Sequence, residues 1–203
     1  MKLKKPKFWD LKEPNLISYL LLPLTLPYFI KSRLFNNNKK ENDKTKKICV
    51  GNIYIGGTGK TPLSILISEI LNQDKKKSVV VKKFYKDQID EQRLIQKYTK
   101  LIISKTRFEG LKEAKKNTFD YVVFDDGLQD PSISYDLKIV CFNNKQWIGN
   151  GFLVPAGPLR ETIHSLRKYD VVVINGDKSK NFEIKKKILD INSKIKIFES
   201  HYI

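Results

Sequence analysis

Short apolar segments alternate with amphipathic segments over most of the chain. The apolar segments are rich in Val and Ile, and each has about the length of one buried strand. They predict strands over residues 48–50, 78–81, 101–103, 121–124, 137–142, 171–174 and 195–198. The segments between them predict helices over residues 62–73, 88–98, 109–117 and 180–190. Strands that alternate with helices are typical of an α/β fold, in which helices cover both faces of a mainly parallel sheet.

The helix predicted over residues 62–73 carries apolar side chains at helical spacing. These side chains are Leu63, Leu66, Ile67, Ile70 and Leu71. Residues spaced in this way lie on one face of an amphipathic helix.

A glycine-rich stretch joins the first strand to this helix and reads Tyr-Ile-Gly-Gly-Thr-Gly-Lys-Thr over residues 54–61. Glycine N–H groups and a helix N-terminus together form a cradle for phosphates. The order of strand, glycines, Lys-Thr and helix therefore predicts a P-loop and a P-loop NTPase-like fold. Lys60 would reach the β- and γ-phosphates, and the Thr61 hydroxyl would ligate Mg²⁺. Tyr54 stands where the full pattern has glycine, and the alternative is a glycine-rich turn with a surface lysine.

Pairs of acidic residues follow two other predicted strands. Asp125 and Asp126 end the strand 121–124, where ligands of open α/β sheets bind. In P-loop enzymes an acid at this place holds Mg²⁺ directly or through water. Asp90 and Glu91 open the next predicted helix, although acids in a first turn are also ordinary partners of the helix dipole. An Asp-Asp-Gly sequence alone is more often a turn, but its combination with a P-loop favours the metal role.

A loop with two prolines and a glycine, residues 155–161, presents Arg160 at its end. Arginine is suited to bidentate contacts with phosphate, and a surface salt bridge with Glu161 explains the residue equally well. His164 and His201 have no companions at metal-ligand spacing, so neither is assigned a role.

The amino-acid composition of the chain indicates which kinds of molecule it binds. A chain of 203 residues with 40% hydrophobic residues is long enough for one α/β domain with a core. Its net charge of +17 favours anionic partners such as nucleotides, acidic lipids or phosphorylated substrates. Only five of the 39 basic residues are arginine, and no basic stripe interleaves with aromatic residues, which argues against a nucleic-acid partner.

Cys49 and Cys141 lie in apolar segments, which favours a reducing compartment without disulfides.

The N-terminal region contains an uncharged, mostly apolar run over residues 16–30 that includes two prolines. It is shorter than the about 20 residues that span a bilayer, and lysines flank it on both sides. We predict that residues 1–35 are an apolar helical segment lying in the interface of an anionic membrane. Residues 36–46 would be a linker, and residues 47–203 the P-loop core. A helix packed against the core is the alternative, and a true span is less favoured.

Four stretches of the chain occur in one order: Val-Gly-Asn-Ile-Tyr-Ile-Gly-Gly-Thr-Gly-Lys-Thr-Pro (50–62), Asp-Glu (90–91), Asp-Asp-Gly-Leu-Gln (125–129) and Pro-Ala-Gly-Pro-Leu-Arg-Glu (155–161). Together they resemble the tetraacyldisaccharide 4′-kinase family, the lipid A 4′-kinases of Gram-negative bacteria. The resemblance runs from about Phe8 to the C-terminus, and the family's loop also lacks a glycine at the position of Tyr54.

The resemblance implies phosphoryl transfer from ATP, with Mg²⁺, to the 4′-hydroxyl of tetraacyldisaccharide 1-phosphate at the cytoplasmic face of the bacterial inner membrane. It implies the lipid disaccharide and an anionic membrane surface as partners, and neither nucleic acid nor an obligate protein partner. It implies catalytic roles for Asp90, which would activate the sugar hydroxyl, and for Asp125, Asp126 and Arg160. The implied metal contacts are Thr61, Asp125 and Glu91. The implied ATP-binding residues are Tyr54, Ile55, Gly56, Gly57, Thr58, Gly59, Lys60, Thr61 and Gln129.

The chain departs from the family in two places. The family usually has Ser-Arg-Gly-Tyr and a longer loop after the second strand, where residues 82–85 read Lys-Lys-Phe-Tyr. Family members also continue into a smaller C-terminal lobe, which holds a histidine thought to assist the catalytic acid. Neither His164 nor His201 matches that histidine, so we expect a C-terminally truncated kinase, a fragment or a degenerate copy that lacks this lobe.

Functions of other classes also agree with parts of the sequence. One is another membrane-associated P-loop ATPase or GTPase, although no guanine-reading Asn-Lys-x-Asp occurs. Another is a non-catalytic basic remnant that binds nucleotide or anionic lipid through its lysines.

Overall fold

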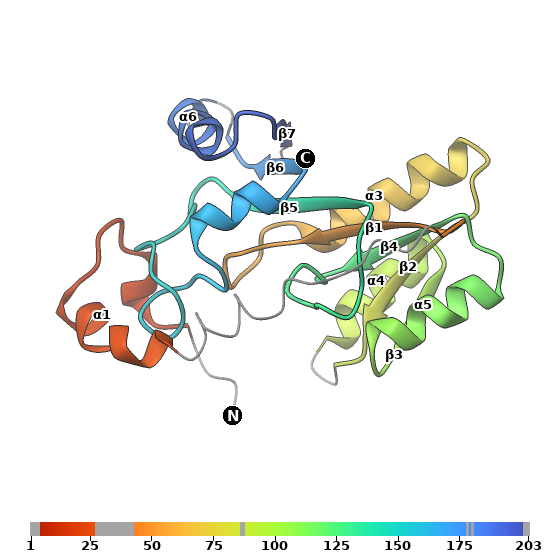
Figure 1. The fold of residues 1–203 in the computed structure, drawn as a ribbon, viewed down its shortest axis with the longest axis horizontal. Helices are drawn as coiled ribbons and strands as arrows, with labels where there is room; N and C mark the ends of the chain where they lie inside the picture. The colour runs from red at the N-terminus through yellow and green to blue at the C-terminus, as the bar shows by residue number, and fades with distance from the viewer. Residues whose placement is uncertain (1–4, 27–42, 86–87, 178, 180, 201–203) are drawn as a thin grey trace. The chain divides into compact units, whose positions relative to one another are not determined.

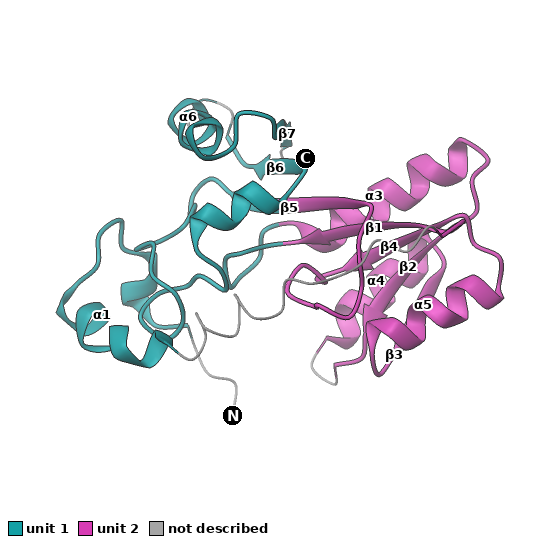
Figure 2. Cartoon of the chain, in the orientation of Figure 1, with its two compact units in different colours: residues 1–36, 52–58, 141–203 teal, residues 37–51, 59–140 magenta. Residues whose placement is uncertain are grey.

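A computed structural model describes residues 5–26, 43–85, 88–177, 179 and 181–200. The chain forms two compact units, each built from segments far apart in the sequence (Figure 2). Unit 1 contains residues 1–36, 52–58 and 141–203, and unit 2 contains residues 37–51 and 59–140. The division into residues 1–35, 36–46 and 47–203 stays a prediction, and much of its N-terminal segment and linker lies outside the described residues.

Unit 2 consists of parallel strands and the helices that connect them (Figure 1). Its strands are β1 (Lys46–Gly51), β2 (Ser78–Lys83), β3 (Leu101–Ser104), β4 (Tyr121–Asp125) and the first part of β5 (Leu137–Asn143). Its helices are α3 (Lys60–Gln73), α4 (Ile89–Tyr98) and α5 (Arg107–Lys116). β1 pairs in parallel with β4 and β5, and β2 pairs in parallel with β3 and β4.

Unit 1 contains the C-terminal strands and the described part of the N-terminal segment. Its elements are η1 (Lys7–Asp10), α1 (Leu16–Leu20), η2 (Leu22–Thr25), η3 (Ile163–Lys168), β6 (Val171–Asn175), α6 (Asn181–Ile191) and β7 (Lys196–Ser200). β6 and β7 pair in parallel, and the sheet has the strand order β3-β2-β4-β1-β5-β6-β7. This order confirms the predicted α/β fold with a parallel sheet.

Different helices cover the two faces of β2. Val79 belongs to the apolar core cluster that contains Leu111 of α5, whereas the Ser78 hydroxyl lies 2.7 Å from the Ser68 hydroxyl of α3. Successive side chains of a strand point to opposite faces, so α5 and α3 lie on opposite sides of unit 2. Because Lys82 is four positions beyond Ser78, it faces the α3 side.

The buried face of α3 differs from its apolar face. Its buried residues are Thr61, Ser64, Ile65 and Ser68, whereas Leu66 and Ile70 are 50% and 48% exposed. Hydrophobicity alone therefore does not identify the buried positions of α3. Small hydroxyl side chains let the helix approach the strands closely and hydrogen-bond polar groups there, as Ser68 does with Ser78.

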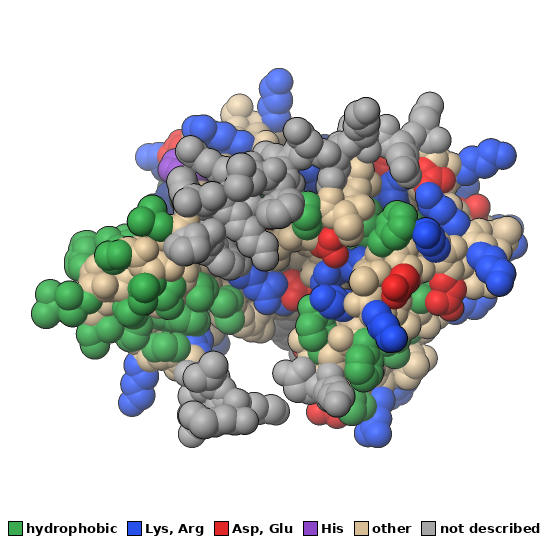
Figure 3. Space-filling model, turned by 60° about the horizontal axis from the view of Figure 1, so that its bottom comes forward, with side chains coloured by type: hydrophobic (Ala, Val, Ile, Leu, Met, Phe, Trp, Pro, Cys, Tyr) green, Lys and Arg blue, Asp and Glu red, His purple; other side chains and the backbone are tan. Residues whose placement is uncertain are grey.

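The described N-terminal segment exposes an unusual number of apolar side chains. The residues concerned, with exposed fractions from 50% to 76%, are Leu16, Ile17, Tyr19, Leu20, Leu24 and Leu26. Figure 3 shows green side chains gathered over this region, at the left of the view. We call these six residues the N-terminal apolar patch. Among the described residues, no helix combines the length and the hydropathy that a membrane crossing requires.

Candidate nucleotide site

The predicted metal acid and the predicted metal hydroxyl meet in unit 2. Asp125 ends β4 with its side chain fully buried. Its Oδ2 accepts a hydrogen bond of 3.1 Å from the Thr61 hydroxyl in the first turn of α3, and its Oδ1 lies 3.4 Å from the Ser64 hydroxyl. The parallel pairing of β1 with β4 places the carboxyl end of β4 beside the strand that leads into the glycine loop. Thr61 and Asp125 therefore supply adjacent oxygen atoms, and their role as metal ligands stays a prediction.

A buried lysine completes this cluster. The Nζ of Lys82 lies 2.6 Å from Asp125 Oδ2 and 2.6 Å from Glu91 Oε2. Burial lowers the pKa of Lys82, but the two carboxylates raise it by more, so the pKa stands above its ordinary value and the side chain stays charged. The sequence analysis gave Lys82 no role. A charged residue continuing an apolar strand was the signal that could have identified it.

The two acidic residues at the start of α4 are both exposed but differ in their contacts. Glu91 reaches the buried cluster through Lys82, while Asp90 is exposed in the first turn of the helix. Consecutive helical residues point about 100° apart, so both cannot face the same group. The structure therefore brings the predicted metal contact Glu91 near Asp125 and leaves Asp90 open to solvent.

Arg107 supports the loop that follows Asp125. Its guanidinium donates to the Asp126 carbonyl and, over 3.1 Å, to Asp130 Oδ2. Partial burial raises the pKa of Asp130, but hydrogen bonds from Ser132 and Arg107 lower it by more, to below its ordinary value. Thr106 and Glu109 form a capping box that starts α5 at Arg107 and so places this side chain.

In the same loop, any other residue in place of Gly127 would force neighbouring atoms to move. A Cβ on Gly127 would lie 2.6 Å from the Tyr135 hydroxyl, which itself donates a hydrogen bond to the Gly127 carbonyl. Asp126 has a φ of 61°, and Gln129 is exposed. The predicted residues Asp126 and Gln129 therefore lie on a loop whose shape is fixed by buried neighbours.

Asparagine side chains shape the part of the glycine loop that belongs to unit 1. Asn52 Nδ2 donates to the Gly56 carbonyl over 3.2 Å and to the Thr58 hydroxyl over 3.1 Å. Asn175, at the end of β6, donates to the Thr58 carbonyl. Gly56 and Gly57 are exposed, so their backbone faces outward. Neither asparagine was singled out from the sequence, since asparagine near a loop is common.

The unit 2 part of the loop begins with Gly59. Gly59 is the N-cap of α3 and has a φ of 83°, a conformation that L side chains rarely adopt. Lys60 and Thr61 follow as the first helical residues, so their N–H groups lie at the positive end of the helix dipole.

The loop with Arg160 packs beside the start of the glycine loop in unit 1. The Arg160 N–H donates to the Ile53 carbonyl over 2.6 Å, and the Ile55 N–H donates to the Pro158 carbonyl over 2.8 Å. Tyr54 and Leu159 form an antiparallel bridge between the same segments. Two of the four stretches that carry the family resemblance are therefore neighbours in space.

Tyr54 links this loop to the N-terminal segment. It is fully buried, and its hydroxyl donates to Asp10 and accepts from Lys5. Burial raises the pKa of Tyr54, and the Asp10 carboxylate raises it further. Trp9 Nε1 also donates to the Pro155 carbonyl over 3.0 Å. The predicted residues Tyr54 and Ile55 thus connect the N-terminal segment with the glycine loop.

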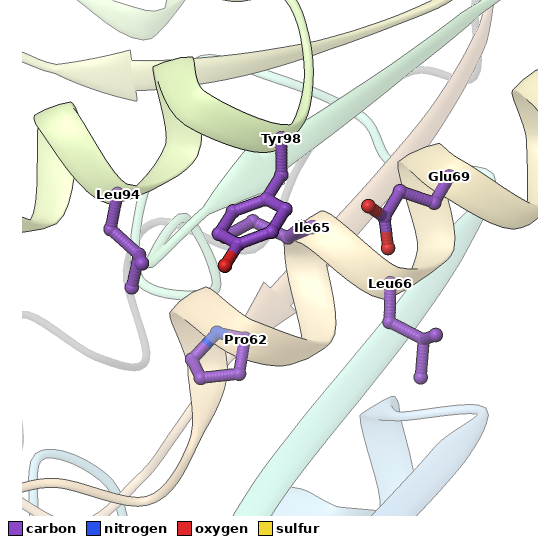
Figure 4. A pocket seen from close by; sticks show the side chains of 6 residues that line it. All are labelled: Pro62, Ile65, Leu66, Glu69, Leu94 and Tyr98. Carbon is purple, nitrogen blue, oxygen red and sulfur yellow. The ribbon is translucent and has the colours of Figure 1, made fainter.

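An apolar groove lies between α3 and α4 (Figure 4). It has a volume of about 250 Å³, and Leu94 and Tyr98 project from α4 toward α3. Its remaining lining residues are Pro62, Ile65, Leu66 and Glu69. None of the predicted site residues lines it, so the groove is not the predicted phosphate site.

The parallel sheet, the glycine loop that ends at the N-terminus of α3 and the Thr61–Asp125 contact together define a P-loop protein of the α/β class. The family model described as tetraacyldisaccharide-1-P 4′-kinase matches residues 17–95 and 86–202. The chain belongs to this family.

Curated relatives agree with the family match. The tetraacyldisaccharide 4′-kinase of Pelagibacter ubique is 50% identical over all 203 residues, which span 65% of that relative's length. The enzyme of the same name from Rickettsia canadensis is 35% identical over 178 residues, which are 79% of this chain and 54% of the relative. The chain thus spans slightly less than two thirds of the more similar of these two relatives.

Solved structures support the fold. LpxK from Aquifex aeolicus, in complex with ATP, has a TM-score of 0.65 at 20% identity and covers 92% of this chain and 82% of its own. FtsY from Mycoplasma mycoides has a TM-score of 0.55 at 12% identity and covers 89% and 68%. Both likenesses confirm the predicted P-loop NTPase-like fold.

Proposed function

We propose that the chain serves the transfer of the γ-phosphate of ATP to the 4′-hydroxyl of a tetraacyldisaccharide 1-phosphate. Family membership and the names of the curated relatives support this activity. The observation that carries it is the contact of Thr61 with Asp125, because phosphoryl transfer by a P-loop enzyme needs a hydroxyl and an acid beside the phosphates.

The ATP phosphates would lie along residues 56–61. The exposed backbone of Gly56 and Gly57 and the first N–H groups of α3 provide donors, and Lys60 provides a positive charge. Asn52 fixes the conformation of the loop through its hydrogen bonds to Gly56 and Thr58. Tyr54, Ile55 and Gln129 are included among the ATP-binding residues on the family resemblance alone.

The oxygen atoms of Thr61 and Asp125 fit Mg²⁺, which is a hard cation. Within the described ranges no three His, Cys, Asp or Glu side chains gather into a metal cluster. Mg²⁺ usually takes one or two carboxylates and completes its shell with phosphates and water, so Asp125 with Glu91 nearby is sufficient. When bound, the ion would neutralise charge on the phosphates.

Acceptor activation would fall to Asp90. An exposed carboxylate at the start of α4 can take up a proton from a sugar hydroxyl without losing a structural contact. Arg160 would contact a phosphate, and Asp126 would act beside Asp125.

The N-terminal apolar patch would place this chemistry at a membrane. Six exposed apolar side chains and a net charge of +17 suit peripheral binding to the anionic cytoplasmic face of the bacterial inner membrane. The acyl chains of the proposed substrate would lie in the same bilayer.

Incubation of the chain with MgATP and tetraacyldisaccharide 1-phosphate tests the proposal. We expect a product with one additional phosphate on the 4′-oxygen, identified by mass spectrometry and phosphorus NMR. Lys60→Ala should abolish the product, and Lys76→Ala, which changes an exposed lysine after α3, should not. Binding of ATP without any product would contradict the kinase function and favour a nucleotide-binding remnant.

A further inference from the structure

Lys82 places a positive charge where a P-loop site normally relies on a metal ion. Its side chain is 3% exposed and that of Asp125 is 0% exposed. A buried carboxylate without a counter-charge is strongly destabilising, and the hydroxyls of Thr61 and Ser64 are neutral. The ammonium of Lys82 therefore compensates the Asp125 charge within the protein itself.

The geometry makes the ammonium a competitor for the same oxygen atom. Asp125 Oδ2 receives both Thr61 and Lys82, at 3.1 and 2.6 Å, whereas Oδ1 has the longer 3.4 Å contact with Ser64. A divalent ion held by Thr61 and Asp125 would share Oδ2 with Lys82. The second contact of Lys82, to Glu91, engages the other carboxylate near the site.

We propose that Lys82 is a positioning residue that acts as a fixed internal cation at Asp125 and reduces the dependence of ATP binding on Mg²⁺. This inference rests on the nucleotide site of the proposed function. Without the divalent ion, the ammonium offsets the repulsion between Asp125 and the phosphates. With the ion present, it weakens the attraction of the acidic residues for that ion.

The quantity that tests this role is the ratio of the ATP dissociation constant in EDTA to that in excess Mg²⁺. We expect the ratio to rise about 5- to 150-fold in Lys82→Met, the usual range of coupling between two ligands of one site. Lys82→Arg keeps the charge and should restore a ratio near that of the wild type. Lys83→Met removes a charge from the neighbouring position of β2, on the opposite side of the strand, and should leave the ratio within about twofold.

Variants that already lack the Asp125 charge distinguish the proposed role of Lys82 from a loss of folding. Lys82→Met leaves a buried carboxylate unpaired, so thermal unfolding is measured for each variant. The ratio is also compared between Asp125→Asn and the double variant Lys82→Met with Asp125→Asn. If Lys82 acts through Asp125, these two ratios agree within about twofold. The same rise in the Asn background as in the wild type would overturn the proposal.

The outcomes also separate this inference from the proposed function. Normal ATP binding with an unchanged ratio in Lys82→Met would overturn the role of Lys82 alone. A wild type that binds no ATP in either condition would overturn both. The titration needs no lipid acceptor, so failure to phosphorylate the disaccharide leaves its result valid.

Discussion

The Thr61 hydroxyl donates a 3.1 Å hydrogen bond to Asp125 Oδ2, although the two residues are 64 positions apart in the chain. One residue opens the helix after the glycine loop, and the other ends the strand that pairs with β1. Their contact joins two sequence motifs into one site, and the proposed metal-assisted phosphoryl transfer rests on it.

Asp125→Asn should weaken MgATP binding and reduce its dependence on Mg²⁺ together. The amide of the variant lacks the negative charge that would hold the ion. Of the two ion pairs of Lys82, the one with Glu91 then remains. Calorimetric titration with ATP at several Mg²⁺ concentrations measures both effects. Asp190→Asn, at an exposed position of α6, is the matched control. MgATP affinity equal to that of the wild type would rule out the metal role.

Asp90→Asn should lower kcat while ATP affinity changes little. General base catalysis typically contributes about 10²- to 10⁴-fold to a rate, and in the proposed function Asp90 would make this contribution. Steady-state transfer to the lipid disaccharide gives kcat, and a parallel titration gives ATP affinity. An Asp90→Asn variant with unchanged kcat would remove Asp90 from the catalytic residues.

Arg107→Met should destabilise the loop that follows Asp125. Hydrogen bonds to charged groups contribute about 1.5–3 kcal/mol each, and the variant loses the bonds to Asp126 and Asp130. Urea unfolding measures the loss, and Arg93→Met, an exposed arginine of α4, should change stability by less than about 0.5 kcal/mol.

The pH dependence of stability gives a second test of this ion pair. The pKa of Asp130 is lowered in the folded chain, so its contribution is present above its unfolded pKa and disappears as pH falls through the folded value. Arg107→Met should reduce this acid sensitivity below the ordinary pKa of an aspartate, because part of the lowering comes from Arg107. An identical profile for variant and wild type would contradict the assigned ion pair.

Leu16→Glu combined with Leu20→Glu should reduce binding to anionic vesicles at least tenfold. Both leucines are more than 70% exposed, and burying a leucine in an apolar environment contributes about 1.5–3 kcal/mol. Co-sedimentation measures the binding, which should also fall with added salt. Phe182→Glu, at a 79% exposed position of α6, is the control for general charge effects. Equal binding of the double variant and the wild type would contradict membrane docking by the patch.

The strands and helices were predictable because their apolar runs and turns are local in the sequence. The glycine loop and the Asp125 position followed from the same order of elements. The sequence did not reveal the buried face of α3, since Ser64 and Ser68 are buried by contacts with distant strands. Lys82 was missed for the same reason: its partners Glu91 and Asp125 are separated from it by 9 and 43 positions.

The asparagines that hydrogen-bond the glycine loop could not be identified from the sequence pattern either. Asn52 and Asn175 are 0% and 5% exposed, and both bond Thr58. A buried asparagine is recognised only once its partners are known, because the residue type alone is typical of turns.

Equilibrium binding of MgATP to the wild type and to Lys60→Ala tests the central claim, that residues 56–61 hold the ATP phosphates. Loss of a charged hydrogen bond of about 1.5–3 kcal/mol predicts binding about 10- to 100-fold weaker in the variant, with Lys76→Ala unchanged. Equal affinity of Lys60→Ala and the wild type would contradict the claim.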